Sequence, residues 1–402
     1  MTEQITAGID PNGLDRFVAA MGRAAWRDRL AALHEAAAKP GWAGRQVALR
    51  HAIELSIERL RHRQPARPPS VAERCIAGYA ADAARVMKSL SPTGRARMRE
   101  ALRRALTAER CLAGPFHLFR MAAMHKARGF AVRFAGFEDA APFDLLIARR
   151  GIEAELACDT LSAEEGRGVH RGAWFRLVDR VDPELQTWLR DHPGRYLLKV
   201  TLPQGLRTPG DCDLLATLHG RITTMLRSQS RADGDEAAVL RLDPLMLAAA
   251  QADELGLMPR LRQEFGPEAH LSVTAAGGGV FVMAARAGRE NEVAAALRRR
   301  LEHIAPTRLT GTRPGILAML IEDTGRAEWR QLRDRLELEG EARQFMTHPD
   351  ARSVVAVTCM SRLELFGQGV PDGTAEGELR FRNPAHPAAR AEALAPAVLS
   401  SV

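Results

Sequence analysis

Acidic side chains occupy three of four alternate positions, 153, 155 and 159, along one short segment of the sequence. Because neighbouring side chains of a strand point to opposite faces, Glu153, Glu155 and Asp159 would share one face of a strand over 152–158. The pair Arg150-Gly151 predicts a tight hairpin that joins this strand to the preceding one, which would bring Asp144 near the acidic row.

Carboxylates that converge in this way repel one another, so they require divalent cations, arginines or protonation. A hard cation such as Mg²⁺ binds oxygen ligands and can position a water molecule for attack on a phosphodiester. Asp144, Glu155 and Asp159 are therefore candidate metal ligands. We expect Mg²⁺ as cofactor if the protein is active and no cofactor otherwise.

The elements around the acidic strand resemble a known family. Pro142-Phe143-Asp144, a hairpin and an acidic strand lie within the order helix, three strands, helix, strand, over about residues 108–203. This arrangement resembles the PD-(D/E)XK nuclease superfamily, and the resemblance implies a restriction-endonuclease-like mixed sheet. The chain is also similar to a bacterial variant whose strand reads Glu-x-Glu-Cys-Lys and is followed by Thr, Ser, an acidic pair, Gly-Arg and His. The positions kept here are Glu155, Cys158, Thr160, Ser162, Glu164, Gly166, Arg167 and His170.

Two positions depart from that pattern: Ala157 replaces the second carboxylate and Asp159 replaces the lysine. The resemblance implies that the lysine orients the attacking water and that the missing carboxylate binds metal. Our first hypothesis is thus a degenerate, non-cleaving domain that serves as a binding or assembly module.

The alternative is a Mg²⁺-dependent DNA nuclease whose catalytic roles have moved. Lys199, in a strand predicted over 196–202, or Lys126, in a helix predicted over 115–128, would then supply the positive charge. The candidate catalytic residues under this alternative are Asp144, Glu155, Asp159 and Lys199.

Positive charge dominates the chain, with a net charge of +8 and an isoelectric point near 9.8. Such a charge permits binding to nucleic acid, but only four of the 57 basic residues are lysines, which is typical of a GC-rich bacterial genome. A solvated basic surface without a partner is the other interpretation. The candidate nucleic-acid contacts open and line the predicted helix beside the acidic strand; they are Arg167, His170, Arg171 and Arg176.

Hydrophobic periodicity, glycines and prolines predict a mixed α/β chain. We expect an all-helical region over 1–107, a restriction-endonuclease-like domain over 108–230, a C-terminal α/β region over 237–366 and a flexible tail over 367–402. Within the second region, strands near 130–134, 143–148, 152–158 and 196–202 are expected to form one sheet, covered by helices near 115–128 and 174–189.

Several classes of protein are disfavoured by composition. No apolar run approaches the roughly 20 residues of a membrane span, and the first residues lack the basic start and apolar core of a signal peptide. The five cysteines lie far apart without a Cys-x-x-Cys pair, so reduced thiols are expected. We expect a cytoplasmic protein without a membrane partner. A third hypothesis is a protein-interaction component of a bacterial multiprotein system, with the basic charge incidental; the sequence does not indicate an oligomeric state.

Overall fold

The computed structural model describes residues 10–62, 68–107, 110–207, 211–245, 254–266, 269–366 and 378–400. The fold is α+β, as the sequence predicted, and it contains two mixed sheets. The chain divides into two compact units. Unit 1 comprises residues 1–36, 48–163 and 294–402, and unit 2 comprises residues 37–47 and 164–293.

The described residues of the N-terminal region form helices, as expected, and two of these helices begin at clear capping residues. Ser70 caps α5 (Val71–Ser89) with a capping box that includes Glu73, and Ser91-Pro92 opens α6 (Pro92–Ala105). The other helices before the first strand are α1 (Pro11–Met21), α2 (Arg23–Ala37), α3 (Trp42–Arg50), α4 (Ala52–Arg61) and α7 (Ala113–Ala127).

Unit 1 is built on a six-stranded sheet in the order β1-β2-β3-β9-β10-β11. The first three strands form an antiparallel meander, whereas β3, β9 and β10 run parallel to one another. The strands are β1 (Ala131–Arg133), β2 (Leu145–Arg149), β3 (Ile152–Ser162), β9 (Gly315–Glu322), β10 (Val354–Ser361) and β11 (Leu379–Arg382).

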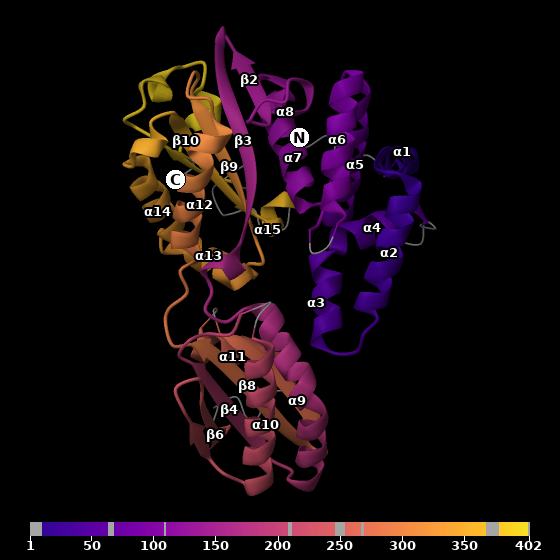
Figure 1. Cartoon of the computed structure of the whole chain (residues 1–402), viewed down its shortest axis with the longest axis vertical. Coiled ribbons are helices and arrows are strands. Elements are labelled where there is room, and N and C mark those ends of the chain that lie inside the picture. Colours follow the sequence, from indigo (N-terminus) through magenta and orange to yellow (C-terminus); the bar gives the residue numbers. More distant parts are fainter. Residues whose placement is uncertain are drawn as a thin grey trace. The chain divides into compact units, whose positions relative to one another are not determined.

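Helices cover both faces of this sheet (Figure 1). Ala154 and Leu156 of β3 join the large apolar core that contains Phe116 and Phe119 of α7. Asp159 is an odd number of positions from Ala154 and Leu156 along β3, so its side chain points to the opposite face of the sheet. It contacts α12 (Val293–Arg308), which therefore lies on that face. Shorter helices complete the unit: α8 (Ala135–Glu138), α13 (Arg326–Asp334), α14 (Glu337–Met346), α15 (Arg362–Leu365) and α16 (Ala395–Val398).

Unit 2 contains a second sheet, in the order β5-β6-β4-β8-β7. Its strands are β4 (Arg195–Leu202), β5 (Ala232–Gly234), β6 (Val239–Pro244), β7 (His270–Ala276) and β8 (Gly279–Ala287). One face packs on α9 (Arg171–Asp191) and α10 (Cys212–Ser228), and the other on α11 (Glu254–Phe265) (Figure 1).

The expected sheet was wrong in one strand and one helix. Strand β4 was placed beside β3, but it pairs with β6 and β8 in the other sheet, and α9 packs there with it. The neighbour of β3 is β9, more distant in sequence, because the larger segment of unit 2, residues 164–293, separates β3 from most of α12 and from β9. The order helix, three strands, helix, strand is realised by α7, β1, β2, β3, α12 and β9.

The expected flexible tail was also wrong for its described part. Residues 367–377 lie outside the described residues, but β11 pairs with β10 along the sheet edge. Leu394, Ala397 and Val398 are fully buried in the core of unit 1. Small apolar residues thus complete a core here despite the low content of large side chains.

Candidate site on the acidic strand

The predicted hairpin between β2 and β3 is confirmed. Arg150 and Gly151 both adopt the left-handed conformation that a tight two-residue turn requires, with φ of 47° and 80°. Only Ile152–Leu156 pairs with β2, so the rest of β3 has β9 on one side and an open edge on the other.

Asp144 is the side chain that closes this open edge. Its Oδ2 accepts a hydrogen bond from the N–H of Cys158 at 2.7 Å, in place of a strand carbonyl. The same oxygen accepts a second bond from Nη2 of Arg308, also at 2.7 Å. Burial raises the pKa of the Asp144 carboxyl, and the Arg308 guanidinium opposes that rise. Asp144 therefore has a structural function in the sheet.

Glu155 is fully buried and is held by the loop that precedes β9. One carboxylate oxygen accepts from the N–H of Thr310 at 2.8 Å, and the other accepts from the hydroxyl of the same residue. Arg313 lies 3.6 Å from this carboxylate and 2.8 Å from that of Glu153. Both glutamates of the strand thus share one arginine.

Asp159 makes a bidentate ion pair with Arg300 of α12. Nε and Nη2 of the guanidinium lie 2.7 and 3.2 Å from its two carboxylate oxygens. The side chain also accepts a hydrogen bond from the N–H of Thr160 at 2.9 Å, which covers a second N–H group of the open edge.

A small pocket of about 210 Å³ lies beside this edge, and Asp144, Cys158, Asp159, His117 and Arg308 line it. Nε2 of His117 lies 3.1 Å from the carbonyl oxygen of Ala318, and burial lowers the pKa of this imidazole to about 4. Burial also raises the pKa of the Cys158 thiol well above its usual range, so neither side chain is charged at neutral pH.

The three predicted metal ligands do not fit a magnesium ion. The carboxylate of Asp144 already accepts hydrogen bonds from Arg308 and from the N–H of Cys158. Both oxygens of Glu155 accept from Thr310, and both oxygens of Asp159 accept from Arg300. Across the described ranges, no group of three or more His, Cys, Asp or Glu side chains is placed to hold a metal. Arginines supply the positive charge that the converging acids require.

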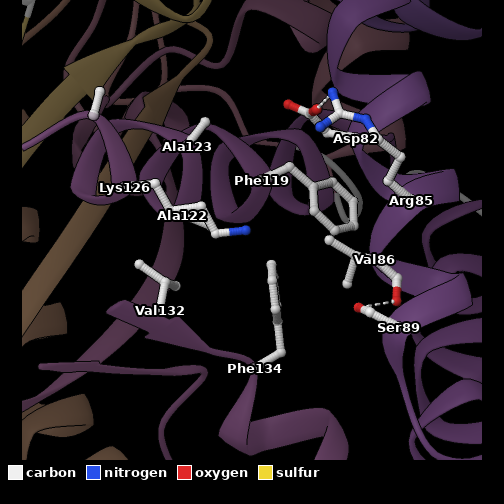
Figure 2. Close-up of a pocket in the computed structure, with 11 residues that line it drawn as sticks. Asp82, Arg85, Val86, Ser89, Phe119, Ala122, Ala123, Lys126, Val132 and Phe134 are labelled. Atoms are coloured by element: carbon white, nitrogen blue, oxygen red, sulfur yellow. Dashed lines mark hydrogen bonds and ion pairs between the residues drawn. The ribbon is translucent and has the colours of Figure 1, made fainter. Parts of the chain in front are cut away.

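Lys199 belongs to unit 2, whereas the acidic strand belongs to unit 1. It lies in β4 of unit 2, and its Nζ is 3.2 Å from Oδ2 of Asp243 on the neighbouring strand β6. Lys126 also lies away from the small pocket, because it lines a different one between α5 and α7 (Figure 2).

The four predicted nucleic-acid contacts all belong to unit 2, whereas the acids belong to unit 1. Arg167 is only 4% exposed and pairs with Glu164. The same carboxylate accepts a hydrogen bond from the N–H of Arg171 at 2.6 Å, and the N–H of His170 donates to Leu206. Arg176 is half-buried on α9. Arg167 therefore has a packing position rather than an exposed one.

Charge is distributed unequally between the two units. In unit 2, 18 arginines and lysines are balanced by 18 aspartates and glutamates. The whole net charge of +8 consequently lies in unit 1. A negatively charged partner attracted by net charge would therefore bind to unit 1.

Sequence reasoning missed the arginines that neutralise the acids. Arg300, Arg308 and Arg313 each lie more than 140 residues after the acid with which they pair. A signal was present in the run Arg298-Arg299-Arg300 on an amphipathic helix, because convergent carboxylates require cations from elsewhere in the chain.

No protein-family model, no curated protein and no solved structure matches this chain. Among the described residues, no helix is both long enough and apolar enough to cross a membrane.

Proposed function

We propose that this chain is a non-cleaving binding or assembly protein built on a nuclease-like core. The order of α7, β1, β2, β3, α12 and β9 supports this proposal, since it is the element order of the family that the sequence resembles. The insertion of unit 2 between β3 and α12 leaves that order intact.

The observation that carries the proposal is the pairing of every acid on the candidate site with an arginine. Arg308 pairs with Asp144, Arg300 with Asp159, and Arg313 with Glu153. A metal ion would have to displace these guanidinium groups, which lose their partners when it binds. The site supports a rigid, neutralised sheet edge better than it supports water activation.

Nucleic acid is the class of partner that the charge favours. Helix α6 carries five arginines and one glutamate in 14 residues, and it belongs to unit 1. Arg97, Arg99 and Arg103 donate hydrogen bonds to backbone carbonyls of neighbouring helices, and Arg97 also interacts electrostatically with the carboxylate of Glu138. Arg104 is 63% exposed, and its Nε lies 3.9 Å from the exposed carboxylate of Glu100 on the same helix. Phosphate contacts need this combination of charge and access.

A cleavage assay tests the first part of the proposal. The full chain is incubated with Mg²⁺ or Mn²⁺ and with single- or double-stranded DNA, and we expect little or no cleavage. Asp144→Ala and Glu155→Ala are the matched variants. Robust cleavage that both variants abolish would overturn the proposal in favour of a metal-dependent nuclease. Cleavage that survives both variants would indicate a contaminant.

A further inference from the structure

A second pocket, of about 710 Å³, lies in unit 1 between helices α5 and α7 and the end of β1 (Figure 2). It is larger than the pocket beside the acidic strand, and the two have only Phe119 in common among their lining residues. Ligand pockets typically have volumes of about 300–1,000 Å³ and apolar walls with a few polar groups.

Aromatic and aliphatic side chains form the walls. The rings of Phe119 and Phe134 lie on two sides of the cavity, with centroids 6.2 Å apart and planes tilted by 49° (Figure 2). Val86 of α5 and Val132 of β1 continue this surface. A flat apolar group can contact both rings, because aromatic pairs favour offset and edge-to-face geometries at such separations.

One cation points into this space. Nζ of Lys126 lies 6.0 Å from the ring centroid of Phe134, and the ammonium points toward the two phenylalanine rings (Figure 2). Across the described part of the chain, no carboxylate lies within ion-pair distance of this lysine. Asp82, the acid at the rim, pairs with Arg85 instead.

We propose that this pocket binds a small organic anion whose flat apolar body lies against Phe119 and Phe134 and whose acidic group pairs with Lys126. The preference for an anion follows from the charges, since two cations, Arg85 and Lys126, line the pocket with one carboxylate, that of Asp82, and Arg85 forms the ion pair with it while Lys126 attracts it at longer range. The site is separate from the acidic strand and does not depend on the proposed function.

Two fluorescent probes with similar rings test this inference on the full chain. The probe 8-anilinonaphthalene-1-sulfonate is an anion, and N-phenyl-1-naphthylamine is its neutral counterpart. Lys126→Gln should raise the Kd of the sulfonate at least five-fold and leave that of the neutral probe unchanged within two-fold. Lys126→Arg should restore sulfonate binding, because it returns the charge.

Matched variants separate the pocket from general surface effects. Lys88→Gln removes the same charge from an exposed position of α5 outside the pocket, and it should change neither Kd. Ala123→Phe fills the cavity and should weaken both probes; Ala127→Phe, on the exposed part of the same wall, replaces it if thermal unfolding shows that the first variant is misfolded.

The inference is overturned if Lys126→Gln leaves sulfonate binding unchanged, or if both probes still bind a folded cavity-filling variant as they bind the native chain. Equal loss of both probes in Lys126→Gln would also overturn it, because the lysine would then not select for charge.

Discussion

At the scale of single residues, the acids of β3 act as paired structural groups. Removal of Arg308 would leave Asp144 partly buried and without its counter-charge, although the bond to Cys158 would remain. We expect Arg308→Gln to lower the free energy of unfolding by about 1–3 kcal/mol, since a half-buried ion pair loses one partner.

A double-mutant cycle with Asp144→Asn measures this coupling in urea unfolding. The double variant should recover part of the loss, and Arg330→Gln, at an exposed position of α13, should change stability little. Strict additivity of the two single substitutions would show that the pair does not stabilise the strand edge.

Two buried histidines make unit 1 sensitive to acid. Burial lowers the pKa of His117 to about 4 and that of His125 to about 3. Between these values and the ordinary pKa of 6.5, the unfolded chain binds protons that the folded chain does not, so stability falls as the pH falls below about 6.5.

Each histidine contributes up to about 1.4 kcal/mol per pH unit in this window. His117→Gln keeps a donor for Ala318 and should reduce the slope of unfolding free energy against pH by one histidine's contribution, measured by urea unfolding between pH 7 and pH 4. Burial raises the pKa values of Asp144 and Glu322, so these two carboxyl groups increase the stability of the folded chain as the pH falls. Both groups are present in the native chain and in His117→Gln, so their effect cancels in the comparison. His34→Gln, at an exposed position, is the control; equal slopes for native chain and His117→Gln would contradict the assignment.

At the scale of elements, α3 depends on a residue of another helix. The first N–H groups of α3, those of Trp42 and Ala43, donate to the carboxylate of Asp179 on α9 at 2.7 and 2.8 Å. Gly41, with φ of 97°, lets the carboxylate approach, because a Cβ there would collide with it. The ring of Trp42 stacks on Phe175 of the same helix.

We therefore expect Asp179→Ala to cost about 1–2 kcal/mol, as the loss of a helix cap does. Amide hydrogen exchange of Trp42 and Ala43 should accelerate in this variant. Asp191→Ala, at the exposed end of α9, should leave both amides protected. Unchanged exchange in Asp179→Ala would mean that the cap contributes nothing to α3.

The elements themselves were largely predictable from sequence, whereas their pairing was not. The strand β4 has the right length, alternation and proximity to follow β3, and local pattern carries no information on which sheet it joins. For the same reason, the convergence of Asp144 with the acidic strand was anticipated through the hairpin, but Arg300 and Arg308 were missed. Those arginines come from a helix that tertiary packing alone brings to the strand.

At the scale of the whole molecule, net charge and unit structure make a prediction about nucleic acid. Each phosphate contact on duplex DNA contributes about 0.9 to the slope of log K against log salt. Replacing Arg95 and Arg104 of α6 together by alanine should reduce that slope by about two. Replacing Arg171 and Arg176 of unit 2 should leave it unchanged, because unit 2 has no net charge.

Filter binding at several salt concentrations measures both slopes. If the α6 variant keeps the native slope and the unit 2 variant has a reduced slope, then Arg171 and Arg176, the contacts proposed from the sequence, form the binding surface. Absence of binding at low salt to single and double strands alike would leave a protein partner as the surviving interpretation.

The inserted position of unit 2 predicts an order of folding. Its two ends meet, since the N–H of Glu292 donates to the carbonyl of Gly166 at 2.7 Å. Once residues 164–293 are folded, β3 is joined closely to α12, and only α12 and one loop precede β9, instead of a long open loop whose closure costs about 4 kcal/mol. In pulse-labelling hydrogen exchange during refolding, amides of β4 and β8 should be protected before those that link β3 to β9. Simultaneous or reversed protection would contradict this order.

The long separation of β3 from β9 also affects the chain while it is being synthesised. β3 ends at Ser162 and its parallel neighbour begins at Gly315, so at about 5–20 residues per second the ribosome needs roughly 8–30 s to supply the partner. During that interval the strand has two unprotected lengths of edge, and charged side chains on an edge discourage pairing with other chains. The arginines that neutralise the acidic row are synthesised only with α12 and the loop after it. Until then, we expect the negative charge of the row to oppose pairing of the nascent strand with other chains.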